Sequence, residues 1–229
     1  MFRGIAILAM IVYHCCFDLA QYGWLVADFN NDWRWIWFRI PILSSFLFVA
    51  GASLALAEAR GQTAAQFWRH AGLIAGAAAL VTAGSYAMFP QSYIYFGVLH
   101  AIVVMGVLAR PALRAGAWLI VAGLAVLALG ATIRHPFFDQ PLWHWVGMMT
   151  FKPRTEDYVP LFPWFGMLLL GAGAAAWRVR RDARSDRLRS WVPPAGATWI
   201  TWLGRHSLAV YMVHQPLLLG TMELVRRLT

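Results

Sequence analysis

The sequence predicts an all-α membrane protein, a polytopic helical bundle with about seven transmembrane helices. Composition is the first observation behind this prediction. Of the 229 residues, 60% are hydrophobic, only 13% are charged and 13 are tryptophan. These values lie outside the range of soluble domains. We therefore expect a single transmembrane domain over residues 1–229.

The second observation is a series of apolar runs of about 20 residues, the length that crosses a hydrocarbon core at about 1.5 Å per residue. The predicted helices cover residues 4–26, 35–57, 70–89, 93–110, 115–133, 159–177 and 198–220. The first run is expected to be a mature helix rather than a signal peptide, because His14 and Asp18 interrupt it and no small-residue cleavage site follows. The runs GLIAGAAALVTAG and LLLGAGAAAW are expected to permit close helix packing.

The third observation is how the arginines are distributed between the two sets of connections. One set contains Arg3, Arg60, Arg69, Arg110, Arg114 and the six arginines from Arg178 to Arg189. The other set contains fewer basic residues and five acidic ones, and it includes the long aromatic-rich connection 134–158. Since cytoplasmic loops are enriched in Lys and Arg, the N-terminus is predicted to be cytoplasmic and the aromatic loop external. The arginines behind the net charge of +9 are thus expected to orient the helices and to contact lipid head groups. No nucleic-acid partner is expected.

Polar residues inside the apolar runs are expected to lie in one layer of the membrane. His14 follows Arg3 by eleven residues, so it lies about 16 Å deeper, and Asp18 lies about 6 Å beyond it on the same helix face. The same layer contains His100, Arg39, Asp157, and His214 with Ser207 and Tyr211 on its face. Ionisable groups are costly in a bilayer unless they pair or line a wet cavity, so this layer is a candidate functional site.

Each of these residues also has a structural interpretation. His14 and Asp18 would then only link two helices, and His100 would be a histidine with both nitrogens hydrogen-bonded. Arg39 and Asp157 would form an interfacial salt bridge. The shared depth favours the functional interpretation, because structural links need not lie in one layer.

An imidazole beside a carboxylate suits two kinds of chemistry. The carboxylate fixes the tautomer of the imidazole and raises its basicity, so the pair acts as a general base on a hydroxyl or amine, as acyl transfer requires. The same pair passes protons in transporters. Spacing alone does not separate these two uses.

Five stretches, in order along nearly the whole chain, resemble the heparan-alpha-glucosaminide N-acetyltransferase family and its bacterial relatives. They are RGIAILAMIVYH followed by FDL, then FLFVAGASLALA, YFGVLHAI, DYVPLFPWFGMLLLGAG and LGRHSLAVYMVHQPLLL. The Arg-Gly opening is also similar to that of membrane acyltransferases that O-acetylate surface polysaccharides. The resemblance implies transfer of an acetyl group from cytoplasmic acetyl-CoA to an amino or hydroxyl group of a sugar or glycan across the membrane. It also implies a bacterial inner membrane as the location.

With this function, roles for the polar layer are predicted from its depth, its shared helix faces and its chemistry. His14, Asp18, His100 and His214 would surround one catalytic cavity with no metal, and the base would be His14 held by Asp18, or else His100. Acetyl-CoA would lie near Arg3, Ser207 and Tyr211, and the acceptor near Arg39, Asp157 and Trp164.

Two functions from other classes remain open. The polar layer would equally serve a proton-coupled transporter or flippase of a small amphiphile, or a non-catalytic membrane subunit whose polar groups only support assembly. Acetyl transfer to a glycan would distinguish an acetyltransferase from both of these. Proton-dependent uptake would distinguish the transporter from the non-catalytic subunit.

Overall fold

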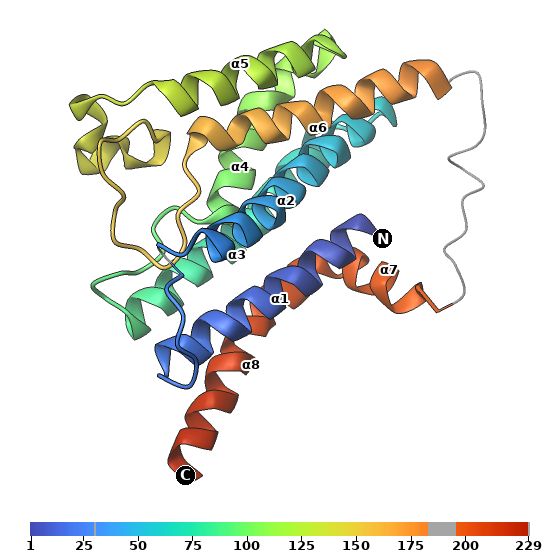
Figure 1. Cartoon of the computed structure of the whole chain (residues 1–229). Helices are drawn as coiled ribbons and strands as arrows, with labels where there is room; N and C mark the ends of the chain where they lie inside the picture. Colours follow the sequence, from blue (N-terminus) through green and yellow to red (C-terminus); the bar gives the residue numbers. More distant parts are fainter. Residues whose placement is uncertain (30, 183–195, 229) are drawn as a thin grey trace. The chain divides into compact units, whose positions relative to one another are not determined.

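A computed structural model describes residues 1–29, 31–182 and 196–228 (Figure 1). These residues are organised as helices, and no strand occurs within the described ranges. The α-helices are α1 (Phe2–Gln21), α2 (Trp33–Ala59), α3 (Ala64–Met88), α4 (Val98–Ala109), α5 (Trp118–Thr132), α6 (Leu161–Asp182), α7 (Thr198–Arg205) and α8 (Ser207–Leu228). Three 3-10 helices are η1 (Arg110–Ala115), η2 (Pro136–Asp139) and η3 (Pro141–Val146). The all-α prediction is confirmed.

Five helical segments in the described part are long and apolar enough to cross a membrane: α1, α2, α3, α4 together with η1, and α8. The helix α5 has only 15 residues, and α6 has 22 residues but is not among the five. The chain therefore has the helices of a polytopic membrane protein. Seven crossings remain a prediction.

The predicted helix over residues 198–220 is two helices. α7 ends at Arg205 and α8 begins at Ser207, with His206 between them. Both the backbone N–H of His206 and its ring Nδ1 lie 3.0 Å from the carbonyl oxygen of Trp202, so both nitrogens donate to a carbonyl in the last turn of α7. Because these bonds satisfy a carbonyl at the helix end, they favour termination there.

Packing divides the chain into two units, and each is described by itself. The first contains Met1–Phe46 and the described residues of Trp191–Thr229. In this unit α1 packs along α7 and α8 (Figure 1). A Cβ on Gly4 would overlap the carbonyl oxygen of Ile200, so the absence of a side chain at Gly4 permits α1 to cross α7 closely. Further along, Asp18 meets Gln215, so α1 and α8 run in the same direction.

An aromatic cluster joins the start of α2 to α1 within the first unit. Phe29 and Trp35 stack with ring centroids 4.1 Å apart, and Tyr13 contacts both of them edge-on. The guanidinium of Arg39 on α2 lies near the Tyr13 hydroxyl. The cluster thereby fixes the α1 face next to His14.

The second unit, Leu47–Ser190, is assembled through glycines. Gly123 of α5 and Gly166 of α6 face each other, and a Cβ on either would lie within 2.8 Å of the other's carbonyl oxygen. Gly51 of α2 meets the backbone of α6 at Leu168, and Gly171 of α6 meets α2 in the same way. Small residues let membrane helices approach closely, as expected for the run LLLGAGAAAW.

The other run, GLIAGAAALVTAG, does not behave as expected. A Cβ on Gly72, Gly76 or Gly84 of α3 would meet no heavy atom within 4 Å among the described residues. These glycines therefore serve no close helix contact in the described part of the chain. The composition of α3 resembles that of α6, but composition does not say which helix faces a neighbour.

The basic and acidic connections of the second unit lie at opposite ends of α4. At one end, the Arg110 guanidinium lies 4.2 Å from the Phe67 ring centroid, which brings the start of α3 beside η1. At the other end, Ser92 donates to Glu156 at 2.5 Å, and the Val159 N–H donates to the Phe96 carbonyl at 3.1 Å. The prediction that the basic connections are cytoplasmic and the aromatic loop is external requires these connections to lie at opposite ends of α4. The side on which each end lies remains a prediction.

Candidate functional site

A buried polar link joins α1 to α8 in the first unit. Asp18 has no exposed surface, and the Gln215 side-chain amide donates to both of its carboxylate oxygens, at 2.9 and 3.0 Å. A buried carboxylate is costly unless donors surround it. Gln215 therefore holds Asp18 in place.

His214 lies beside this link and is only 8% exposed. Its ring centroid is 5.2 Å from that of His14. Its Nδ1 lies 2.6 Å from the backbone oxygen of Tyr211, and a carbonyl can only accept, so Nδ1 carries the proton. The Nε2 atom of the neutral ring therefore keeps its lone pair.

Two acceptors in this site are buried without a donor. Within the described part of the chain, neither Nε2 of His214 nor Oε1 of Gln215 has a hydrogen-bond partner. Buried polar atoms are normally paired, and leaving one unpaired costs about 1–3 kcal/mol. The site is therefore suited to a ligand that donates hydrogen bonds.

His100, in the second unit, has a different environment. Its Nδ1 accepts from the Gly97 N–H at 3.3 Å, so its Nε2 carries the proton and donates to the Thr82 hydroxyl at 3.2 Å. That hydroxyl in turn donates to the Ile94 carbonyl at 2.7 Å. Both ring nitrogens are therefore used, which supports the structural interpretation of His100.

The carboxylate of Asp157, from the segment before α6, lies at the start of α4, where Gly97 also contacts His100. Its Oδ2 accepts from the Val98 N–H at 2.9 Å, and a Cβ on Gly97 would overlap that carboxylate. Carboxylates stabilise helix N-termini by accepting from first-turn amides. Asp157 thus anchors the segment before α6 to α4.

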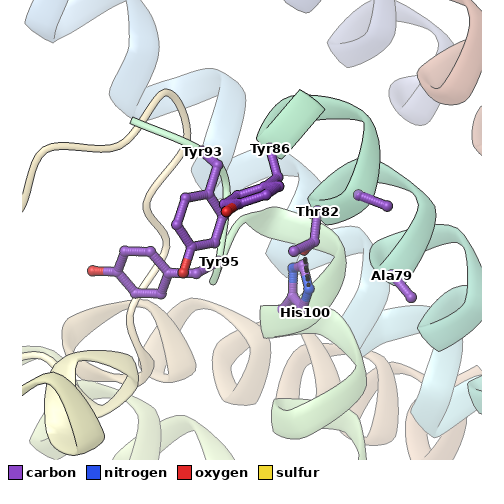
Figure 2. Close-up of a pocket in the computed structure, with 7 residues that line it drawn as sticks. Ala79, Thr82, Tyr86, Tyr93, Tyr95 and His100 are labelled. Carbon is purple, nitrogen blue, oxygen red and sulfur yellow. Dashed lines mark hydrogen bonds between the residues drawn. The ribbon is translucent and has the colours of Figure 1, made fainter. Parts of the chain in front are cut away.

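A shallow hollow of about 600 Å³ lies beside these residues in the second unit. Its lining consists of Ala79, Thr82, Ala83, Tyr86, Tyr93, Tyr95 and His100. Figure 2 shows Tyr93 and Tyr95 on the extended segment before α4, with the Thr82 hydroxyl bonded to His100. The hollow is mostly aromatic, and His100 has no ring nitrogen left to offer a ligand there.

The loop between α5 and α6 is organised by hydrogen bonds around His144. The His144 Nε2–H donates to the Asp139 carbonyl at 3.0 Å, so Nδ1 accepts from the Tyr95 hydroxyl at 3.3 Å. Burial raises the pKa of Tyr95 to about 12, and the nearby Tyr93 adds to the rise. The Thr150 hydroxyl and N–H donate to the Asp139 carboxylate and lower its pKa below the ordinary value of 3.8.

The other predicted site residues are distributed between the two units. Arg3 and Ser207 are half-buried in the first unit, where Tyr211 lies with its ring centroid 5.6 Å from that of His214. Trp164 is half-buried on α6 in the second unit. Of the arginine-rich segment 177–194, residues 183–194 lie outside the described residues. A single cavity around all four predicted catalytic residues remains a prediction.

Sequence analysis did not single out Gln215. The signal was present, because an amide inside an apolar run next to a histidine is itself an intramembrane polar group that needs a partner. Its importance follows from the contact with Asp18, which lies 197 positions away in the chain.

The fold and this site define a polytopic helical membrane protein with a buried polar site between α1 and α8. The family model described as heparan-alpha-glucosaminide N-acetyltransferase, catalytic, matches residues 1–216. The chain belongs to this family, which confirms the resemblance seen in the sequence. Comparisons with curated proteins and with solved structures gave no match.

Proposed function

We propose that the protein is a membrane acetyltransferase that transfers an acetyl group from acetyl-CoA to an amino or hydroxyl group of a sugar or glycan. The observation that carries this proposal is the family match over residues 1–216, which includes every residue of the buried site. The donor would be cytoplasmic and the acceptor would be presented on the other side of the membrane.

The two unpaired hydrogen-bond acceptors of the site, on His214 and Gln215, support this chemistry. When bound, acetyl-CoA would supply the acetyl group as a thioester. The lone pair on Nε2 of His214 is buried and unpartnered among the described residues, so it is available to an N–H or O–H of the acceptor. Arg3 is the residue proposed to meet the phosphates, because guanidinium groups bind phosphate oxygens in pairs.

In the proposed step, His214 acts as the general base. Its Nε2 takes the proton of the acceptor N–H or O–H, while that nitrogen or oxygen forms a bond to the acetyl carbonyl carbon. The carbon–sulfur bond breaks, its electron pair leaves on sulfur, and the sulfur then takes the proton from the imidazolium. His14, whose ring centroid lies 5.2 Å from that of His214, is the alternative base; the sequence analysis proposed it as the base itself, held by Asp18.

The other predicted residues keep their proposed places. Ser207 and Tyr211, with Arg3, would be on the donor side of the site. Arg39, Asp157 and Trp164 would line the path of the acceptor.

Acetyl transfer by the purified chain in lipid nanodiscs tests the proposal. With radiolabelled acetyl-CoA and a panel of amino sugars and neutral sugars, we expect label in the acceptor, with transfer abolished or strongly reduced by His214→Ala. Absence of transfer to every acceptor would overturn the proposal. Proton-dependent uptake by proteoliposomes without any transfer would indicate a transporter.

A further inference from the structure

The helix α7 is short and amphipathic, and it is separate from α8, which follows it. Its polar residues Thr198, Thr201 and Arg205 are spaced by three and four positions, so they lie on one face. The rest of α7 is apolar or aromatic and includes Trp199 and Trp202, which are 53% and 56% exposed. Its eight residues are too few to cross a membrane.

The first unit places α7 beside the starts of two long apolar helices. A Cβ on Gly204 would lie 3.1 Å from the backbone nitrogen of Gly4, near the start of α1, and α8 begins at Ser207, directly after α7 ends. Both α1 and α8 are long and apolar enough to cross a membrane, and they run in the same direction. Figure 1 shows α7 turning away from the direction of α8 at this point. These positions favour a location at the membrane surface.

One face of α7 is used for packing and the opposite face is open. Ile200 and Gly204 meet Gly4 of α1, and the helical period puts Trp202 on the other side of α7. Within the described part of the first unit, α7 packs only on α1 and α8. Tryptophan is enriched at membrane interfaces, where its apolar ring and its N–H group are both accommodated at head-group level.

This end of the first unit is also basic. Residues 1–17 and 196–222 contain Arg3 and Arg205 but no aspartate or glutamate. Arg205 is exposed and lies on the polar face of α7. A surface that combines exposed tryptophans with unopposed basic charge complements lipid head groups of net negative charge.

We infer that α7 is an interfacial helix that binds anionic phospholipids. Trp199 and Trp202 lie at head-group level, and the Arg205 guanidinium binds a lipid phosphate through two of its N–H groups. The break at His206 lets α7 lie along the surface while α8 enters the membrane. The inference concerns a lipid partner, so it does not depend on acetyl transfer.

Single nitroxide labels along α7 in lipid nanodiscs test its depth. The full chain without Cys15 and Cys16 is labelled at one position at a time, and collision rates with oxygen and with a water-soluble nickel complex are measured. Oxygen is more soluble in hydrocarbon than in water, so we expect it to dominate at positions 199, 202 and 203, and the nickel complex at 198, 201 and 205. High nickel accessibility at all six positions would place α7 in water, and low accessibility to both reagents would mean that protein covers it. Either result would overturn the inference.

Brominated lipids test the preference for negative charge. A bimane fluorophore on Leu203→Cys is placed in phosphatidylcholine nanodiscs that contain brominated phosphatidylglycerol or, in the matched sample, brominated phosphatidylcholine. We expect stronger quenching by the phosphatidylglycerol, and Arg205→Gln to lower the ratio of the two quenching constants by up to roughly fivefold, the contribution of one basic side chain at an anionic surface.

Arg226→Gln is the matched control for Arg205→Gln. Arg226 lies near the other end of α8 and is paired with Glu223 at 2.9 Å, so this variant should keep the ratio of the unchanged chain. Equal quenching by both lipids with Arg205 intact, or an unchanged ratio in Arg205→Gln, would overturn the inference.

Discussion

Two histidines show how a single residue type is assigned different roles by its neighbours. His214 has its proton directed to a backbone carbonyl, so a lone pair faces the site. His100 spends both ring nitrogens on Gly97 and Thr82. Both lie in apolar runs of similar composition, so hydrogen-bond partners and not sequence context distinguish a candidate base from a structural residue.

Replacement of each histidine in the first unit distinguishes the two candidate bases. We expect His214→Ala to lower kcat by roughly 10²- to 10⁴-fold, the usual contribution of general base catalysis, with the protein still folded. His14→Ala should have the smaller effect. The measurement is single-turnover acetyl transfer, together with size-exclusion chromatography as a folding control. The opposite order of effects would make His14 the base.

His100→Ala is expected to act mainly on stability. The variant leaves the Gly97 N–H and the Thr82 hydroxyl without their partner, at a cost of roughly 1–3 kcal/mol. Thermal unfolding in detergent should therefore show a lower Tm than wild type, and a larger loss than Thr82→Ser, which keeps the hydroxyl and both of its bonds. A His100→Ala protein with wild-type Tm would contradict the structural role.

The hydrogen bonds from Thr150 to Asp139 are expected to make the loop between α5 and α6 sensitive to acid. Its pKa is lowered in the folded protein, so the loop gains stability that is present above the ordinary value of 3.8 and lost as the pH falls through the lowered value. Hydrogen exchange at the Thr150 amide, corrected for its intrinsic rate, should therefore accelerate only below pH 3.8. In Asp139→Asn the amide should exchange faster at neutral pH and lose this dependence.

At the scale of helices, glycines decide which pairs pack closely. The contact of α2 with α6 depends on Gly51, since a Cβ there would overlap the carbonyl oxygen of Leu168. We expect Gly51→Ala to lower the free energy of unfolding by roughly 1–3 kcal/mol through overpacking. Thermal or denaturant unfolding in detergent measures this loss.

Gly76→Ala is the matched control for Gly51→Ala. It also lies inside a helix, but no described heavy atom lies within 4 Å of its Cβ position. Alanine favours a helix over glycine by about 0.5–1 kcal/mol, so this variant should be as stable as wild type or slightly more stable. Equal losses in both variants would contradict a packing role for Gly51.

At the scale of the whole molecule, the number of membrane crossings depends on α5 and α6. α5 begins after η1, at the basic end of α4, and leads to the loop whose His144 contacts Tyr95 just before the other end of α4. Its 15 residues extend about 22 Å, less than the roughly 30 Å of a hydrocarbon core. We expect α5 and α6 to cross nonetheless, because they connect opposite ends of α4.

Single cysteines test this topology in a background that lacks the native Cys15 and Cys16. With seven crossings, Phe137→Cys should react with a membrane-impermeant maleimide added outside intact cells, and Arg114→Cys should react only after the membrane is opened. Labelling of both from the same side would mean that α5 does not cross. A cysteine at Leu124, an exposed apolar position in the middle of α5 that is expected to face lipid, serves as the unreactive control.

The sequence predicted much of this protein because composition and period are local properties. Apolar length identified the long helices, and the motifs identified the family over residues 1–216. Helix ends were less predictable. The predicted helix over 93–110 starts only at Val98, because residues 92–96 bond to the segment around Glu156. At the break at His206, the His206 ring bonds the Trp202 carbonyl, a contact that no apolar count detects.

The sequence by itself determined that the chain is helical, apolar enough for a membrane, a member of an acetyltransferase family, and rich in polar groups at positions where they need partners. Only the tertiary structure decided which partners they have. Asp18 is bonded to Gln215, 197 residues away, and the Tyr211 carbonyl sets the tautomer of His214. The physical reason is that a lone pair becomes available or unavailable through donors and acceptors supplied by other turns and helices, and the folded arrangement determines which of those groups reach it.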